Sequence, residues 1–194
     1  MTPGPTPPLL RQAAEGELPS WTEAGPLRRA HIRRVMALLA EWAEVLALAE
    51  GERIRWVAAG ALHDVLRDAD PKILRDQVPP EFRGIPDSLL HGPAAATRLQ
   101  AEGVEDESFL RAVAYHTLGH GELDAVGRAL YAADFLEPGR SFEREWRGAL
   151  ARRFPEDPEG VLVEVVRARM TRQMARGWPL RAETVDFWNT LVGE

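Results

Sequence analysis

Hydrophobic positions recur every three to four residues along most of this chain, which is the period of helices that bury one face. The longest such stretch begins at Pro26 and runs to about Glu50, just before Gly51. Proline in the first turn and glycine just past the last are typical helix boundaries. The buried face predicted for this helix holds His31, Val35, Leu38, Trp42 and Val45. His31 is therefore a polar residue at the head of an apolar stripe.

The same period predicts further helices along the rest of the chain. Their expected ranges are 53–68, 71–78, 94–101, 105–118, 122–136, 141–154, 158–176 and 181–192. The clearest loop lies between Pro79 and Pro86, and no stretch shows the alternation that predicts a strand. We therefore expect an all-α fold, a single helical bundle.

The first 20 residues differ in composition, with prolines at positions 3, 5, 7, 8 and 19. Proline removes a backbone donor and interrupts helices. We expect residues 1–20 to form a Pro-rich flexible arm, with at most a short, weak helix from Leu9 to Leu18. Residues 21–194 would form one domain, since 194 residues at 45% hydrophobic content suit a single core.

Composition excludes several classes of function. The net charge is −6, so no overall basic field attracts nucleic acid. With no cysteine, the chain has no disulfide, thiolate metal site or cysteine nucleophile. No apolar run reaches the roughly 20 residues of a membrane span, and the N-terminus lacks a leader pattern. We expect a cytoplasmic protein without nucleic-acid or membrane partners, either a monomer or a homodimer.

The most informative stretch is Ala59–Arg67, where His63 and Asp64 stand side by side in a run of small apolar residues. The period places the pair in the middle of the helix predicted over 53–68. Burying an ionised carboxylate there costs several kcal/mol unless it is paired or binds a metal. Candidate partners lie on the apolar face or at the start of other helices: His31, His91, His116 and Asp134.

A lone inward histidine is most often structural, but several converging ones each need a partner, and a metal supplies one to all. Imidazole and carboxylate ligands suit iron, manganese, cobalt, nickel or zinc. Because six ligands exceed the needs of one catalytic metal, Asp64 could bridge two ions. A hydroxide bound by such a pair attacks phosphorus near neutral pH.

The ordered set His…His-Asp…His…His…Asp resembles the HD superfamily of metal-dependent phosphohydrolases, and within it the YqeK-like symmetrical diadenosine tetraphosphatases. The resemblance covers about Leu27 to Asn189. It is carried by Ala61-Leu62-His63-Asp64, Leu89-Leu90-His91-Gly92-Pro93, Ala114-Tyr115-His116-Thr117-Leu118-Gly119 and Tyr131 to Arg140. It implies an HD-type domain that uses two transition-metal ions, iron or one of the metals named above, to split diadenosine tetraphosphate into two ADP.

The resemblance also implies a role for each matching residue. One metal would be held by His31, His63, Asp64 and Asp134. The second would be held by His91 and His116, with Asp64 as the bridge and a metal-bound hydroxide as the nucleophile. Ile32 departs from the family, which carries a small hydroxyl residue there.

Three further residues are candidates for contact with phosphate, each with an alternative. Arg67, one turn after His63, could stabilise the charge of the transition state or pair with Asp64 or Asp68. Arg140 could bind phosphate or cap the preceding helix. Thr117 could bind phosphate or its own helix carbonyl.

The other polar and aromatic signals have plainer interpretations. His120 is expected in an exposed loop, with proton donation to the leaving phosphate as the alternative. Four arginines form a basic cluster that we expect to face solvent, although one of them could reach a polyphosphate. They are Arg28, Arg29, Arg33 and Arg34. Most tryptophans anchor the core, although one tryptophan, or Phe82 in the loop, could stack on adenine.

Two other functions remain open from the sequence. One is an HD phosphohydrolase for another small nucleotide, such as a nucleoside monophosphate. The other is a catalytically silent nucleotide-sensing domain. The complete ligand set argues against silence, because a sensor need not keep every ligand.

Overall fold

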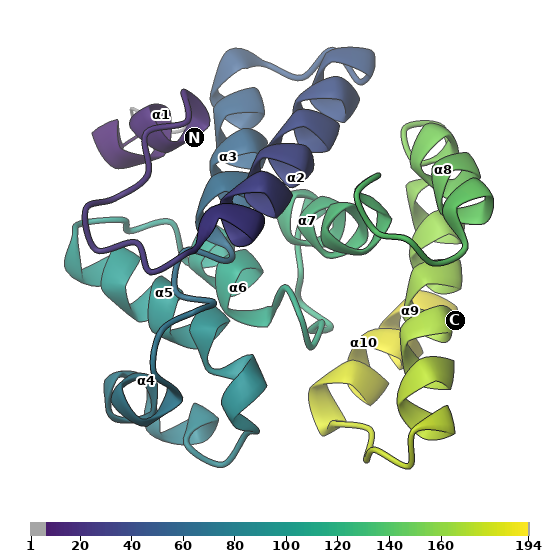
Figure 1. The fold of residues 1–194 in the computed structure, drawn as a ribbon. Coiled ribbons are helices and arrows are strands. Elements are labelled where there is room, and N and C mark those ends of the chain that lie inside the picture. The colour runs from purple at the N-terminus through teal and green to yellow at the C-terminus, as the bar shows by residue number, and fades with distance from the viewer. Residues whose placement is uncertain (1–6, 194) are drawn as a thin grey trace.

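The computed structural model describes residues 7–193, and all regular structure in this range is helical, which confirms the all-α prediction (Figure 1). The first six α-helices are α1 (Pro8–Ala14), α2 (Pro26–Val45), α3 (Glu50–Leu62), α4 (Pro71–Gln77), α5 (His91–Ala101) and α6 (Glu107–Tyr115). They are followed by α7 (Ala125–Leu136), α8 (Arg144–Arg153), α9 (Pro158–Ala175) and α10 (Ala182–Val192). Two 3₁₀ turns, η1 (Pro80–Phe82) and η2 (Asp87–Leu89), lie between α4 and α5. No helix in the described range is long and apolar enough to cross a membrane.

The boundary predicted between the first two long helices was wrong. Helix α2 ends at Val45 instead of Glu50, and Gly51 lies in the first turn of α3. The chain turns at Ala47, which takes a left-handed conformation with φ of 49°. Glu50 starts the next helix because an acidic side chain is favourable at the positive end of the helix dipole.

The helices that carry the key histidines also end earlier than predicted. Helix α3 ends at Leu62 and α6 at Tyr115, so His63 and His116 each occupy the residue just past the helix. The expectation that His63 and Asp64 lie in the middle of a helix was therefore wrong. A helix C-terminus leaves its last carbonyls unbonded, and both histidines use one of them.

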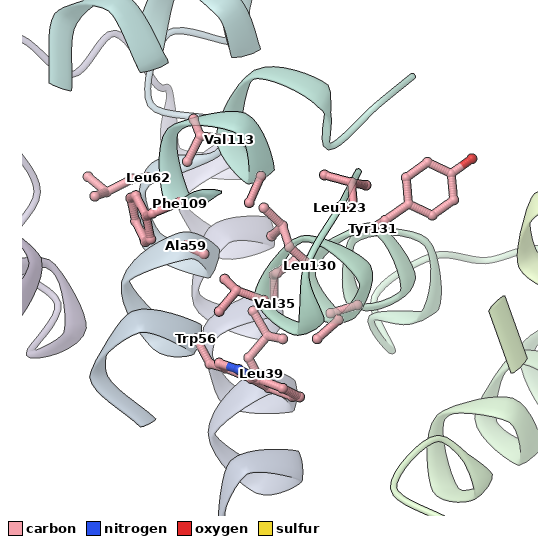
Figure 2. Close-up of a cluster of buried hydrophobic side chains, with 14 of the residues drawn as sticks. Val35, Leu39, Trp56, Ala59, Leu62, Phe109, Val113, Leu123, Leu130 and Tyr131 are labelled. Atoms are coloured by element: carbon pink, nitrogen blue, oxygen red, sulfur yellow. The ribbon is translucent and has the colours of Figure 1, made fainter. Parts of the chain in front are cut away.

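The core lies where α2, α3, α6 and α7 meet, and Figure 2 shows Val35, Leu39, Ala59 and Leu130 gathered there. Close approach of α2 to α3 depends on Gly60. A Cβ atom at this position would lie 2.9 Å from Leu39 Cδ1 and 3.2 Å from the backbone of Met36. The packing of α3 on α2 holds His63 beside His31.

The N- and C-terminal helices flank this core. Helix α1 packs on α3 with Leu10 and Ala13 buried, so residues 8–14 belong to the packed part of the molecule, not to a flexible arm. The expectation for residues 1–6 falls outside the described range. Helix α7 lies between the α2–α3 pair and the C-terminal helices, of which α8 and α9 contact it (Figure 1). Helix α9 thereby reaches the same region as the histidines.

Candidate metal centre

The two carboxylate oxygens of Asp64 face two different pairs of histidines. Oδ2 lies 3.6 Å from the Nε2 atoms of both His31 and His63. Oδ1 lies 3.0 Å from Nε2 of His91 and 3.5 Å from Nε2 of His116. All five residues are buried. Four histidines from four separate segments thus share one carboxylate, as the order of residues in the sequence predicts.

Backbone carbonyls fix the orientation of two of these rings. Nδ1 of His63 lies 2.8 Å from the carbonyl of Gly60, and Nδ1 of His116 lies 2.8 Å from that of Val113. A carbonyl only accepts, so each Nδ1 is the donor. Each Nε2 therefore presents a lone pair to the interior, which is the form that binds metals.

The inward nitrogen atoms lie close to one another. Nε2 of His63 is 3.3 Å from Nε2 of His31, and Nε2 of His91 is 3.2 Å from Nε2 of His116. In two groups, His31–His63–Asp64 and Asp64–His91–His116, all ligand atoms lie within 4.8 Å of one another. Two unprotonated ring nitrogens at this separation repel each other, and a proton or a metal ion between them removes the repulsion. The donor set therefore fits divalent metal binding, with nitrogen and oxygen ligands that suit transition metals.

Asp134 and Glu137 hold the ring of His31 from both sides. Nε2 of His31 is 3.1 Å from Oδ1 of Asp134, and Nδ1 is 3.2 Å from Oε1 of Glu137. Glu137 also accepts from Arg34 Nε at 2.5 Å and from the backbone of Gly139 at 2.7 Å. Glu137 was not singled out from the sequence, although its position about one turn after Asp134, just past the end of the buried helix α7, was a usable signal.

The local electrostatics keep the carboxylates ionised and His63 neutral. Burial lowers the pKa of His63 to about 3. Burial also opposes the charged form of His31, but hydrogen bonds to Asp134 and Glu137 outweigh it and raise the pKa to about 8. Burial favours a neutral Asp64, yet the surrounding imidazoles hold its pKa well below the ordinary value. Metal binding at His31 would therefore release a proton.

A cavity of about 370 Å³ opens over this cluster and is rich in arginine. The carboxylates that line it are those of Asp64 and Asp134, and the arginines that line it are Arg28, Arg67, Arg140, Arg169, Arg172 and Arg176. Thr117 also lines the cavity, and Trp178, 56% exposed, lies at its rim. Many cations around few anions give this cavity a positive field, which favours anionic groups.

Arg67 lines the cavity without an ion pair to any residue in the described range, so the alternative pairing with Asp64 or Asp68 does not form there. Asp64 pairs instead with Arg28, whose Nη1 lies 2.6 Å from Oδ2. Asp68 accepts from the backbone of Gly25 at 2.7 Å. Arg28 is thus the member of the basic cluster that reaches the cavity.

The other two phosphate candidates also line the cavity. Arg140 donates to the Asp134 carbonyl at 2.9 Å and to its Oδ1 at 2.7 Å, so the helix-capping alternative forms. Its side chain remains 35% exposed beside the cavity. The backbone carbonyl of Thr117 accepts a hydrogen bond from Arg169 at 3.3 Å. Within the described part of the chain, the Thr117 hydroxyl makes no hydrogen bond to a carbonyl of the preceding helix, so that alternative does not form.

Arg169 on α9 is a further residue of this site that the sequence did not single out. Its Nη2 lies 2.8 Å from Oδ2 of Asp134, and its guanidinium lies 4.3 Å from the centre of the Tyr131 ring. Its spacing of four and three residues from buried Val165 and Val166 places it on the inward face of α9 and was the available signal.

Two secondary candidates lie away from the cavity. His120 packs its ring 4.6 Å from that of Tyr115 and accepts from the backbone of Glu122, and it is not among the cavity residues. Phe82 is only 6% exposed and packs 5.2 Å from the Tyr115 ring. Phe82, which was one alternative for stacking on adenine, is therefore packed in the core and has no face open to the cavity.

Comparison with known proteins agrees with this geometry. The HD domain family matches residues 28–139. Over 122 residues the chain is 30% identical to the symmetrical bis(5'-nucleosyl)-tetraphosphatase of Bacillus subtilis, covering 62% of this chain and 64% of that protein. Over 117 residues it is 30% identical to the protein of the same name from Staphylococcus aureus, covering 57% and 59%. The matches thus span less than two thirds of these relatives.

A solved structure has the same fold over nearly the whole length. It is a predicted HD superfamily hydrolase involved in NAD metabolism from Clostridium acetobutylicum, with a TM-score of 0.73 and 23% identity. The superposition covers 94% of this chain and 95% of that one. With the His-Asp cluster in place and more than half of the sequence matched, the chain belongs to the HD domain family.

Proposed function

We propose that this protein is a metal-dependent phosphohydrolase that cleaves diadenosine tetraphosphate symmetrically into two ADP. The observation that carries the proposal is one buried carboxylate, Asp64, shared by two pairs of histidines at the base of an arginine-lined cavity. The names of the relatives in Bacillus subtilis and Staphylococcus aureus favour this substrate over other nucleotides.

The ligands divide into two sets around Asp64. His31, His63, Asp64 and Asp134 would hold one ion, while His91 and His116 would hold the second with Asp64 as the bridge. When bound, such ions activate a water molecule and neutralise phosphoryl oxygens. Iron is our first candidate, and manganese, cobalt, nickel or zinc are compatible with the same donors.

The arginines of the cavity would bind and orient the polyphosphate. Arg67 has a guanidinium unengaged by described residues, so it is free to bind the phosphoryl group under attack and offset the charge that develops there. Arg140 and Thr117 would contact neighbouring phosphates. Arg28 and Arg169, already held by Asp64 and Asp134, would add positive charge with little cost in side-chain entropy.

The reaction consumes one water molecule. Its oxygen bonds to one of the two central phosphorus atoms, the bond from that phosphorus to the central bridging oxygen breaks, and the bridging oxygen leaves with the second ADP. Trp178, which lies at the rim of the cavity, would stack on one of the two adenines.

Product analysis tests this function. Purified protein loaded with metal is incubated with diadenosine tetraphosphate, and the products are separated by chromatography, with Asp64→Ala as the inactive control. We expect ADP as the sole product. AMP with ATP would reject symmetrical cleavage, and release of phosphate from a mononucleotide without turnover of the dinucleotide would favour the other phosphohydrolase. Binding of nucleotide without any turnover would favour a silent sensor.

A further inference from the structure

A second cavity, of about 540 Å³, lies between α8 and α9. It opens beside the arginine-lined cavity over the histidine cluster, which is called the metal cavity or first cavity below. The two cavities share Phe135, Phe142 and Arg172 in their walls, so they adjoin. Neither the metal ligands nor the phosphate contacts described above use this second space. A volume of this size is typical of a site for a small organic ligand.

The second cavity has aromatic walls and a few polar groups. Phe142 and Trp146 pack edge-on to Phe135, with ring centres 5.6 and 6.2 Å from it. Arg167, Thr171 and the carboxylates of Glu143 and Glu164 also line the space. Glu164 already accepts from Arg153 and from the Trp146 indole, so Thr171 and Glu143 are the acceptors left for a ligand. Flat aromatic surfaces with a small number of hydrogen-bond acceptors suit a purine, which offers an apolar face and an exocyclic amino donor.

Arg172 stands at the boundary between the cavities. Its guanidinium lies 3.9 Å from the centre of the Phe142 ring, which holds this otherwise exposed side chain in place. It follows Arg169 by one helical turn on α9, so the two cations form a short row leading away from the metal ligands. A phosphate chain that leaves the metal cavity along this row would arrive at the second cavity.

The stoichiometry of symmetrical cleavage calls for such a second site. Because the bond that breaks is at the midpoint of the substrate, a nucleoside extends on each side of the metal centre. Arg176 and Trp178 line the first cavity near the C-terminal end of α9, whereas the second cavity extends to Glu164. Both spaces run along α9, because the first is lined by residues from Arg169 to Arg176 and the second by residues from Glu164 to Ala175.

We propose that the cavity between α8 and α9 binds the second purine nucleoside of a dinucleoside polyphosphate, with Trp146 stacking on the base and Arg172 binding the adjoining phosphate. This inference rests on the proposed function and adds a subsite that selects dinucleotides over mononucleotides. A nucleotide with the same four phosphates and only one nucleoside would leave the cavity empty.

Binding to the metal-loaded protein tests the subsite. Isothermal titration compares diadenosine tetraphosphate carrying a central methylene bridge, which resists cleavage, with the matching adenosine tetraphosphate analogue. We expect the dinucleotide to bind about tenfold more tightly or better, the usual effect of stacking one base. Trp146→Ala and Thr171→Trp, which respectively remove the stacking surface and fill the cavity from an exposed position, should each abolish this preference.

Met174→Trp is the matched control, because Met174 is exposed on α9 and lines neither cavity. It should keep the wild-type preference. Equal affinities of the wild type for the two analogues, or a preference that survives Thr171→Trp and Trp146→Ala, would overturn the subsite. A wild type that fails to convert diadenosine tetraphosphate into two ADP would instead overturn the proposed function itself.

Discussion

Glu137 fixes the ring of His31: its Oε1 lies 3.2 Å from Nδ1, on the side of the imidazole opposite the Nε2 that faces Asp134. A carboxylate behind a histidine orients the ring and increases its basicity toward a metal. Two residues 106 positions apart thus meet at one candidate metal ligand.

Replacing Glu137 by glutamine should weaken metal binding about 10- to 100-fold, because the ring of His31 loses its charged partner. Competition with a coloured chelator measures this affinity. Glu145→Gln, on the exposed face of α8, is the control and should leave it unchanged. Unaltered affinity in Glu137→Gln would show that Glu137 only supports packing around Arg34.

Asp64→Ala should remove bound metal, because both histidine pairs lose their shared oxygen ligand. The wild type should carry about two metal equivalents per chain, and the variant close to none. Elemental analysis of dialysed protein gives these values, with Asp76→Ala on the surface of α4 as the control. If Asp64→Ala retained both equivalents, Asp64 could not be the bridge.

Arg67→Ala should lower kcat about 100-fold while metal content stays at the wild-type value, since a cation acting on the transition state contributes to the chemical step. Steady-state kinetics with diadenosine tetraphosphate and elemental analysis measure the two quantities. Arg33→Ala, on the exposed side of α2, removes the same charge from a residue that does not line the cavity and should have little effect. A rise in KM alone would limit Arg67 to ground-state binding.

Asp106 lies away from the metal centre, and its contacts predict that the stability of the fold depends on pH. It caps α6 by accepting from Phe109 N at 3.0 Å and pairs with Arg55 at 2.8 Å. Burial opposes its charge, but these bonds hold its pKa below the ordinary 3.8. The contribution of Asp106 to the free energy of unfolding should therefore be fully present above pH 3.8. It should be lost as the pH falls through the lower pKa that Asp106 has in the folded state.

Asp106→Ala should accordingly reduce the free energy of unfolding by about 1 kcal/mol at pH 7 and by less near pH 3. Urea titrations at the two pH values measure this difference. Asp106→Asn keeps a capping side chain without the charge, so it should cost less than alanine at pH 7. An alanine effect that does not change between the two pH values would contradict the role of the charge.

Local patterns determined the kind of structure and most of the candidate ligand set. Helical periodicity predicted the all-α fold, and the order of histidines and aspartates placed His31, His63, His91 and His116 on segments that do converge around Asp64. Such features are readable because side-chain direction repeats with the helix. Helix ends were less well predicted, since the turn at Ala47 and the early end of α3 depend on how neighbouring helices pack.

The chemical partners of those ligands were decided by tertiary structure alone. Arg28 meets Asp64 across 36 residues, and Arg169 meets Asp134 across 35. The local period places Arg169 on the inward face of α9 but does not say which residue it meets, and it does not distinguish Arg28 from the solvated arginines beside it. By itself, the sequence determined which residues turn inward and which metals they suit. The packing of α2, α7 and α9 decided which oxygen faces which nitrogen, because those distances arise only when distant helices come into contact.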